Sequence, residues 1–297
     1  MHYLLLAIVF SASMSIVLKI FREPKGNRFG IILGNYLTCI VLAFVTMPEK
    51  SRILSPHPAT LLIGVIEGVM FVAGLTIMQR SIRTNGAMLT TAFAKLGLLV
   101  SLAVSILFFK ETPGIGHIAG ILLVLISMIL IHTDGRSASG KADSAGNAPE
   151  EQSSAASFPL LLLTLLANGS GDAMSKVYEQ LGPGDENAVF FFFLFLTAAI
   201  VTTVLLVIEK ARTGRKTHLP ELAAGIAVGI PNYVSSFFVL QALALLPAFL
   251  VFPVFSTGTI LTVIAVSALF FKERPGRRQM IGLGLLLAAL VLLNLPV

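Results

Sequence analysis

The sequence predicts an all-α membrane protein whose ten transmembrane helices form two inverted repeats of five. Its 297 residues are 56% hydrophobic and only 12% charged, with a mean hydropathy of +0.90, far from the balance of a soluble domain. The apolar residues come in blocks of about 20, the length that crosses a hydrocarbon core of about 30 Å. A segment near the end of the first half also recurs near the end of the second. Together these observations predict membrane spans, and they predict that the spans are duplicated.

Apolar runs bounded by charged residues, proline and glycine predict where each helix lies. We expect five helices in the first half, at residues 3–21, 29–47, 59–79, 86–109 and 114–132. We expect five more in the second half, at residues 158–178, 188–208, 220–244, 247–271 and 276–295. The segment 133–157 is rich in Ser, Ala, Gly and charge, which is typical of a flexible linker. The predicted domains are therefore 1–132 and 158–297.

The internal repeat is the strongest single signal in the chain. AVSILFFKETPG at 103–114 recurs as AVSALFFKERPG at 265–276, and ten of the twelve positions are identical. The same offset aligns Gln79 with Gln241. Because each copy has an odd number of spans, the second copy must enter the membrane from the opposite side. Inverted repeats of this kind are typical of secondary transporters, in which substrate binds near the midplane between the halves.

The loop charges predict the orientation in the membrane. Fifteen of the 21 Lys and Arg residues lie in the five loops of one face, whereas the other face has only Lys50, Arg52 and Lys110. The positive-inside rule then places the fifteen-charge face in the cytoplasm and both termini outside a plasma (inner) membrane. The net charge of +6 does not indicate a nucleic-acid partner, because no basic stripe or recognition motif accompanies it.

Three charged residues lie deep within predicted spans, where each costs about 2.5 to 3.5 kcal/mol on insertion scales. Glu67 and Lys95 fall at similar depths on consecutive helices, so an ion pair is expected that either ties the helices together or lines a substrate or proton path. Asp172 belongs to a polar stretch with Asn168. The glycines of this stretch permit either close approach of a neighbour or local unwinding. We predict that Asp172 lines a central cavity, and the alternative is a place near enough the membrane interface to be solvated.

Further polar residues and two prolines are candidates for the transport path. Asn232, Gln79 and Gln241 either line a cavity or form hydrogen bonds between helices. Pro231 and Pro253 lie inside predicted spans, where proline removes an intrahelical hydrogen bond. The two prolines are therefore predicted hinges, or only kinks.

The ends of the two repeats resemble the drug/metabolite transporter superfamily, EamA type, in LFFKETPGIGHIAGILLVLISMIL and LFFKERPGRRQMIGLGLLLAALVL. The resemblance covers nearly the whole chain outside the linker. It implies ten spans in two repeats and alternating-access transport of small organic solutes. One departure is the absence of Trp, which members commonly carry early in the first helix of each repeat. The repeat-end signature consists of Lys110, Glu111, Lys272 and Glu273.

Lys19 and Lys176 occupy matching places near the ends of the first helix of each half, and they resemble a lysine that the family carries there. From the sequence we expect both side chains to snorkel to the headgroups. Many members of the superfamily also place both termini in the cytoplasm, which is opposite to the orientation that the charges predict here.

We therefore predict a secondary active transporter that moves small organic metabolites, such as amino acids or related solutes, by alternating access. One basic and two acidic groups at depth would suit a zwitterion. The sequence is compatible with transport coupled to protons and with assembly as a homodimer. Neither a cofactor nor a metal is expected, because the chain has no P-loop and its histidines lack metal-ligand spacing.

Two other classes of function are alternatives to a transporter. One is a receptor or assembly subunit that does not transport. The other is an intramembrane enzyme, since the residues at 169–172, Gly-Ser-Gly-Asp, resemble the signature of intramembrane aspartyl proteases. That chemistry needs two carboxylates in one site, and the other aspartates fall in predicted loops. An enzyme is therefore not expected.

Overall fold

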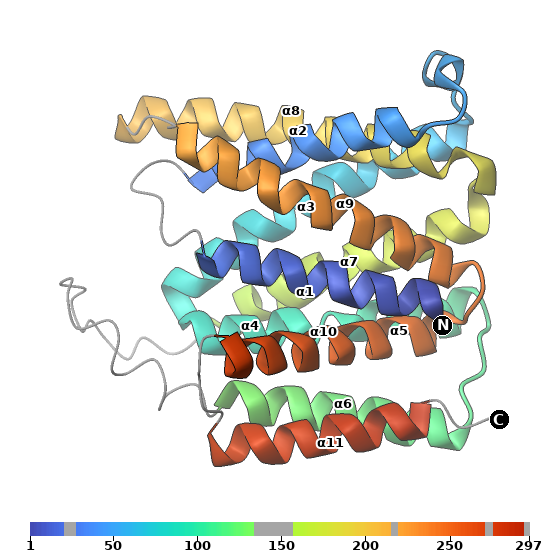
Figure 1. Ribbon diagram of the computed structural model, residues 1–297, viewed down its shortest axis with the longest axis vertical. Helices are drawn as coiled ribbons and strands as arrows, with labels where there is room; N and C mark the ends of the chain where they lie inside the picture. The colour runs from blue at the N-terminus through green and yellow to red at the C-terminus, as the bar shows by residue number, and fades with distance from the viewer. Residues whose placement is uncertain (21–27, 134–156, 215–218, 271–275, 294–297) are drawn as a thin grey trace.

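The computed structural model describes residues 1–20, 28–133, 157–214, 219–270 and 276–293. Within these ranges every regular element is a helix, so the predicted all-α class is confirmed. The helices run along one another in a bundle (Figure 1). α1 begins and α11 ends at the same end of this bundle, here called the termini end. The linker end is the opposite end, where α6 finishes and α7 starts.

The helix bounds follow the predicted ranges within a few residues at most ends. The first half contains α1 (His2–Ile20), α2 (Arg28–Thr46), the short η1 (Lys50–Ile53), α3 (Pro58–Asn85), α4 (Ala87–Lys95), α5 (Leu98–Phe108) and α6 (Ile115–Thr133). The second half contains α7 (Phe158–Leu181), the short η3 (Gly184–Glu186), α8 (Asn187–Thr213), α9 (Leu219–Leu243), α10 (Ala248–Phe270) and α11 (Arg277–Leu293). The predicted linker lies outside the described residues, except at its two ends.

Five helical segments of the described chain are long and apolar enough to cross a membrane: α2, α3, η3 with α8, α9 and α10. Shorter apolar segments lie within α1, α4 and α5, α6 and α11. α7 belongs to neither group. Its polar stretch between Asn168 and Ser175, in which Asp172 lies, lowers the mean hydropathy of the helix. By composition, α7 is therefore the helix least suited to face lipid.

The helix predicted at 86–109 is divided into α4 and α5 by a tightened turn at Leu96 and Gly97. The Gly97 amide donates to the Ala94 carbonyl at 3.1 Å, a spacing of three residues instead of four. This turn lies against α7, because a Cβ added at Gly169 would be only 2.1 Å from the Gly97 carbonyl oxygen. The two backbones touch at these glycines. α7 remains helical there, so the close approach left open by the sequence is the one observed, and local unwinding is not.

Glycines also bring helices of opposite halves into backbone contact. A Cβ at Gly225 of α9 would lie 2.4 Å from the Ile31 carbonyl of α2. A Cβ at Gly68 of α3 would lie at the same distance from the Leu194 carbonyl of α8. Small residues of this kind allow van der Waals packing between helices where no hydrophobic force acts between them.

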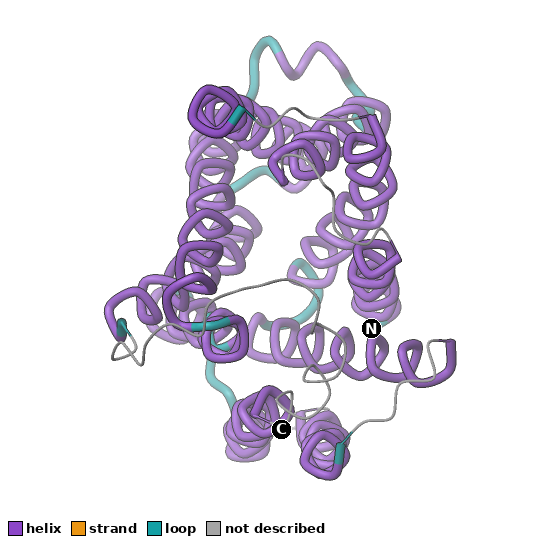
Figure 2. Tube along the Cα trace, turned by 90° about the vertical axis from the view of Figure 1, so that its left-hand side faces the viewer, coloured by secondary structure: helices purple, strands orange, loops and turns teal. Residues whose placement is uncertain are grey.

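The other helix contacts divide the bundle into one larger group of helices and a separate pair, α6 and α11. α1 packs on α9 and α10, and α7 packs on α3, α4 and α5. α6 and α11 pack on each other and form one edge of the bundle (Figure 1). Figure 2, turned by 90°, looks along several of the helices and shows the same pair set apart from the others. The candidate site lies within the larger group.

Candidate functional site

A cavity of about 240 Å³ lies among α1, α3, α7, α8, α9 and α10, so both halves of the chain contribute to its wall. Four of the residues predicted from sequence line it: Glu67, Asn168, Asp172 and Asn232. The wall also contains hydroxyl groups and aromatic rings, namely those of Ser11, Ser175, Ser235, Ser236, Phe71, Phe191, Phe195 and Phe255. The three other predicted candidates, Lys95, Gln79 and Gln241, are not part of this wall.

Glu67 is the most enclosed charged residue of the wall, with only 3% of its surface exposed. Its Oε1 accepts a hydrogen bond from the Ser175 hydroxyl of α7 at 3.0 Å. Its Oε2 is buried and has no hydrogen-bond partner among the described residues. A buried carboxylate oxygen without a donor is costly, so this atom marks a place where a donor from outside the protein would be stabilised.

Asp172 lies on α7, three residues before Ser175, on the same face of the helix. Its charge interacts with those of Lys95 and Glu67. Lys95 is the last residue of α4 and is not itself among the residues that line the cavity. The expected pair of Glu67 with Lys95 is not among the ion pairs of the described residues, and Asp172 is the acid that acts on both. The helix crossing at Gly97 is what brings α4 and α7 together.

Asn232 both lines the cavity and joins helices, since its Nδ2 donates to Asn35 Oδ1 at 3.1 Å. Asn168 donates to the Thr164 carbonyl of its own helix at 2.8 Å. Pro231 and Pro253 are buried, and α9 and α10 continue through them as helices. Their role as hinges stays a prediction.

The prediction that Lys176 snorkels is wrong, because its side chain is only 3% exposed. Its Nζ lies 3.1 Å from Glu111 Oε1 and 2.7 Å from Glu179 Oε2. The reason is that the repeat-end glutamate reaches back into the bundle and supplies the charge that a buried lysine needs. Of the other repeat-end residues, Lys110 is exposed with a left-handed backbone (φ 53°), whereas Lys272 and Glu273 lie outside the described residues.

Glu111 also fixes the start of α10, which belongs to the other half. It accepts hydrogen bonds from the backbone amides of Ala248 at 3.2 Å and Phe249 at 3.4 Å, where the helix dipole favours an anion. The Ser105 hydroxyl donates to the same carboxylate. Burial alone would raise the pKa of Glu111, but these donors and the Lys176 ammonium outweigh it and lower the pKa below its ordinary value.

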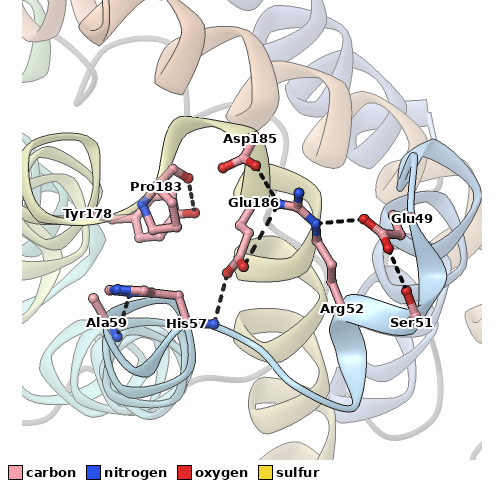
Figure 3. A network of polar contacts seen from close by, with 9 residues as sticks. All are labelled: Glu49, Ser51, Arg52, His57, Ala59, Tyr178, Pro183, Asp185 and Glu186. Carbon is pink, nitrogen blue, oxygen red and sulfur yellow. Dashed lines mark hydrogen bonds and ion pairs between the residues drawn. The ribbon is translucent and has the colours of Figure 1, made fainter.

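A second polar network joins the halves at the termini end (Figure 3). Arg52, in η1, pairs with Asp185 and also lies 3.9 Å from Glu186 in η3. Hydrogen bonding to Arg52 lowers the pKa of Asp185 and, with a further bond from Ser51, that of Glu49. This network was not predicted, although the opposite charges in two loops predicted on one face were a sequence signal for it.

The serines of the cavity wall were also not predicted from the sequence. Ser175 was detectable, because it follows Asp172 by three residues and so shares its helix face. Ser11 and Ser235 carried no comparable signal, since isolated hydroxyls are common in spanning helices and usually bond to their own backbone. Ser235 instead donates to the Ala7 carbonyl of α1 at 2.9 Å.

A family model described as the EamA-like transporter family matches residues 157–295. The matched residues, just under half of the chain, are similar to EamA-like transporter domains. The match confirms the superfamily resemblance predicted from the repeat ends. An EamA-like domain together with several apolar helices makes the chain a multi-pass membrane protein.

Two curated proteins are similar to parts of this chain. An uncharacterized protein of Methanocaldococcus jannaschii is 28% identical over 127 residues, which is 43% of this chain and 91% of that protein. An uncharacterized protein of Haemophilus influenzae is 25% identical over 142 residues, 45% of this chain and only 47% of its own length. A solved structure titled "Crystal structure of protein" has a TM-score of 0.69 and covers 99% of this chain and 97% of its own. At 14% identity, that likeness shows the fold alone.

Proposed function

We propose that the chain is a secondary active transporter that moves small organic metabolites, such as amino acids or related solutes, across the plasma membrane by alternating access. The observation that carries this proposal is the cavity between the two halves, whose wall places Glu67 and Asp172 among hydroxyls and aromatic rings. Charged groups inside a membrane protein usually mark substrate or ion paths.

An inverted pair of five-helix repeats is the architecture that this proposal requires, and the packing supports it. If α1, α2, α3, α4 with α5, and α6 correspond to α7 through α11 in order, each principal contact has a counterpart. The contact of α2 with α9 matches that of α8 with α3, and the contact of α1 with α9 matches that of α7 with α3. The contact of α1 with α10 matches that of α7 with α4 and α5.

The relatives also support a duplicated unit. The match to the Methanocaldococcus jannaschii protein covers 91% of that protein but only 43% of this chain. That relative is therefore about as long as one half of this chain. A five-helix unit existing as a separate protein is what a duplication would start from.

Measurement of flux tests the proposal directly. Purified protein in liposomes is expected to move a labelled metabolite from a panel of amino acids and related amines, and empty liposomes are not. Asp172→Asn and Lys95→Ala are expected to slow this flux, because both alter the charge at the cavity. Asp143→Asn, the same chemical change in the predicted linker, is the matched control and is expected to keep the wild-type rate.

The receptor or assembly-subunit alternative gives a different result in the same preparation. A ligand would then raise the thermal stability of the purified protein, and no solute would cross the liposome membrane. Flux that is unchanged in both Asp172→Asn and Lys95→Ala would overturn the assignment of these residues to the transport path.

A further inference from the structure

Among the described residues, the cavity wall carries two acidic side chains and no basic one. Glu67 and Asp172 are the charged members of its described wall, and Lys95 lies outside that wall. A zwitterion would need a cation for its carboxylate, and the charge of Lys95 already interacts with that of Asp172. The two carboxylates therefore have one compensating cation, Lys95.

When Glu67, Asp172 and Lys95 are all ionised, these three groups together carry one net negative charge. Lys95 offsets one carboxylate through its interaction with Asp172. The other, Glu67, is enclosed, and its buried Oε2 has no partner in the described part of the chain. An uncompensated charge in a membrane interior is unfavourable, so a cation at Glu67 would be stabilised, whereas a neutral zwitterion leaves the excess charge in place.

The rest of the wall fits an apolar body attached to that cation. Phe71 lies one turn after Glu67 on the same face of α3, and Phe191, Phe195 and Phe255 add rings from α8 and α10. Aromatic faces attract ammonium groups and also bind apolar chains. A volume of about 240 Å³ corresponds to roughly eight waters at about 30 Å³ each, which is room for a solute of about ten heavy atoms.

We infer that the cavity binds a small organic monocation, an amine with an apolar body and no carboxylate, and that Glu67 Oε2 accepts the hydrogen bond of its ammonium group. This inference names a narrower substrate class for the proposed transporter. It rests on the transport function only for the claim that the amine crosses the membrane. Binding at Glu67 stands independently of it. Asp172 and Asn168 line the same space and offer further acceptors.

Three probes of one shape distinguish the charge classes: phenethylamine, phenylalanine and 3-phenylpropionate. In a binding assay on the purified full chain, phenethylamine is expected to bind at least about 10-fold more tightly than phenylalanine, and 3-phenylpropionate is expected not to bind. The reverse order, or equal affinity for the amine and the amino acid, would overturn the inference, as would no binding of the amine. This comparison uses the wild-type protein and so does not depend on any variant folding.

Variants then assign the acceptor. Glu67→Gln is expected to weaken phenethylamine binding about 10- to 100-fold, because a charge-assisted hydrogen bond is lost. Glu67→Asp, which keeps the charge, is expected to recover most of the affinity. Glu209→Gln makes the same change near the end of α8 and outside the cavity wall, and it is expected to bind as the wild type does. Unchanged affinity in a folded Glu67→Gln protein would overturn the role of Glu67.

Flux of the same probes separates this inference from the transporter proposal. Exchange of labelled phenethylamine in liposomes supports both. Amine binding without flux keeps the binding site and overturns the transporter. Flux of phenylalanine without amine binding keeps the transporter and overturns the monocation site.

Discussion

A buried ammonium group is stable only beside compensating charge, and Lys176 has two carboxylates within reach, those of Glu111 and Glu179. Removing one member of such a set usually costs more than the set contributes, because the remaining charges stay buried without a partner. The network therefore makes the junction between the end of the first half and α7 sensitive to single substitutions.

Lys176→Met is expected to destabilise the protein by about 3 to 5 kcal/mol, because Glu111 and Glu179 then face each other without a cation. The measurement is thermal unfolding of the purified protein in detergent. A second change, Glu111→Gln, is expected to restore part of the loss in the double variant. If the double variant is no more stable than Lys176→Met alone, repulsion between the two carboxylates is not the cause.

The pKa of Glu111 predicts the acid side of the stability profile. A carboxyl whose pKa is lowered by folding contributes stability that is fully present above its unfolded value and is lost as pH falls through the folded value. Stability should therefore fall as pH drops below the ordinary value of 4.5. Glu111→Gln should lower stability at neutral pH and reduce this acid-dependent loss. An unchanged acid profile in that variant would contradict the assignment.

At the scale of helices, glycine decides which surfaces can meet. Gly68 and Gly225 allow backbone contact across the boundary between the halves, and Gly97 and Gly169 allow it where α5 begins. The continuous apolar pattern over 86–109 predicted one helix, and Gly97 was the only local sign of a division. The division depends on contact with α7, which lies far away in the sequence.

Gly68→Ala tests this packing. The added Cβ would lie 2.4 Å from the Leu194 carbonyl, so α3 and α8 must separate, and we expect a loss of about 1 to 3 kcal/mol in thermal unfolding. Gly284→Ala in α11 is the matched control, because nothing lies within 4 Å of its Cβ position. Alanine is the better helix former, so the control should be neutral or slightly stabilising. Equal effects of the two changes would argue against a tight crossing.

At the scale of the whole molecule, the orientation of the bundle is open to a labelling test. Cys39 is the single cysteine and is buried, so a Cys39→Ser background allows one new thiol at a time. The loop charges predict that Ser51→Cys reacts with a membrane-impermeant thiol reagent in intact cells. They predict that Ala211→Cys reacts only after permeabilisation.

The two alternative outcomes have different meanings. The opposite pattern would reverse the predicted orientation and remain consistent with the ten predicted spans. Reaction of both thiols from the same side would contradict the alternation of spans on which the inverted repeat depends.

The amino-acid sequence by itself determined the all-α class, most helix ends within a few residues and the resemblance to the EamA family. These properties follow from hydropathy, helix length and a repeated segment, which are local along the chain. It also singled out Glu67, Asp172, Asn168 and Asn232, because a polar group in an apolar helix is costly wherever it faces.

Only the tertiary structure decided which of these polar and charged groups lie together. Glu67 and Asp172 meet in one cavity, Lys95 falls outside its wall, and Lys176 is buried beside Glu111. The physical reason is that periodicity fixes the depth and face of a side chain on its own helix. The glycine crossings between helices fix which neighbour that face meets, and pairing of charges depends on that neighbour.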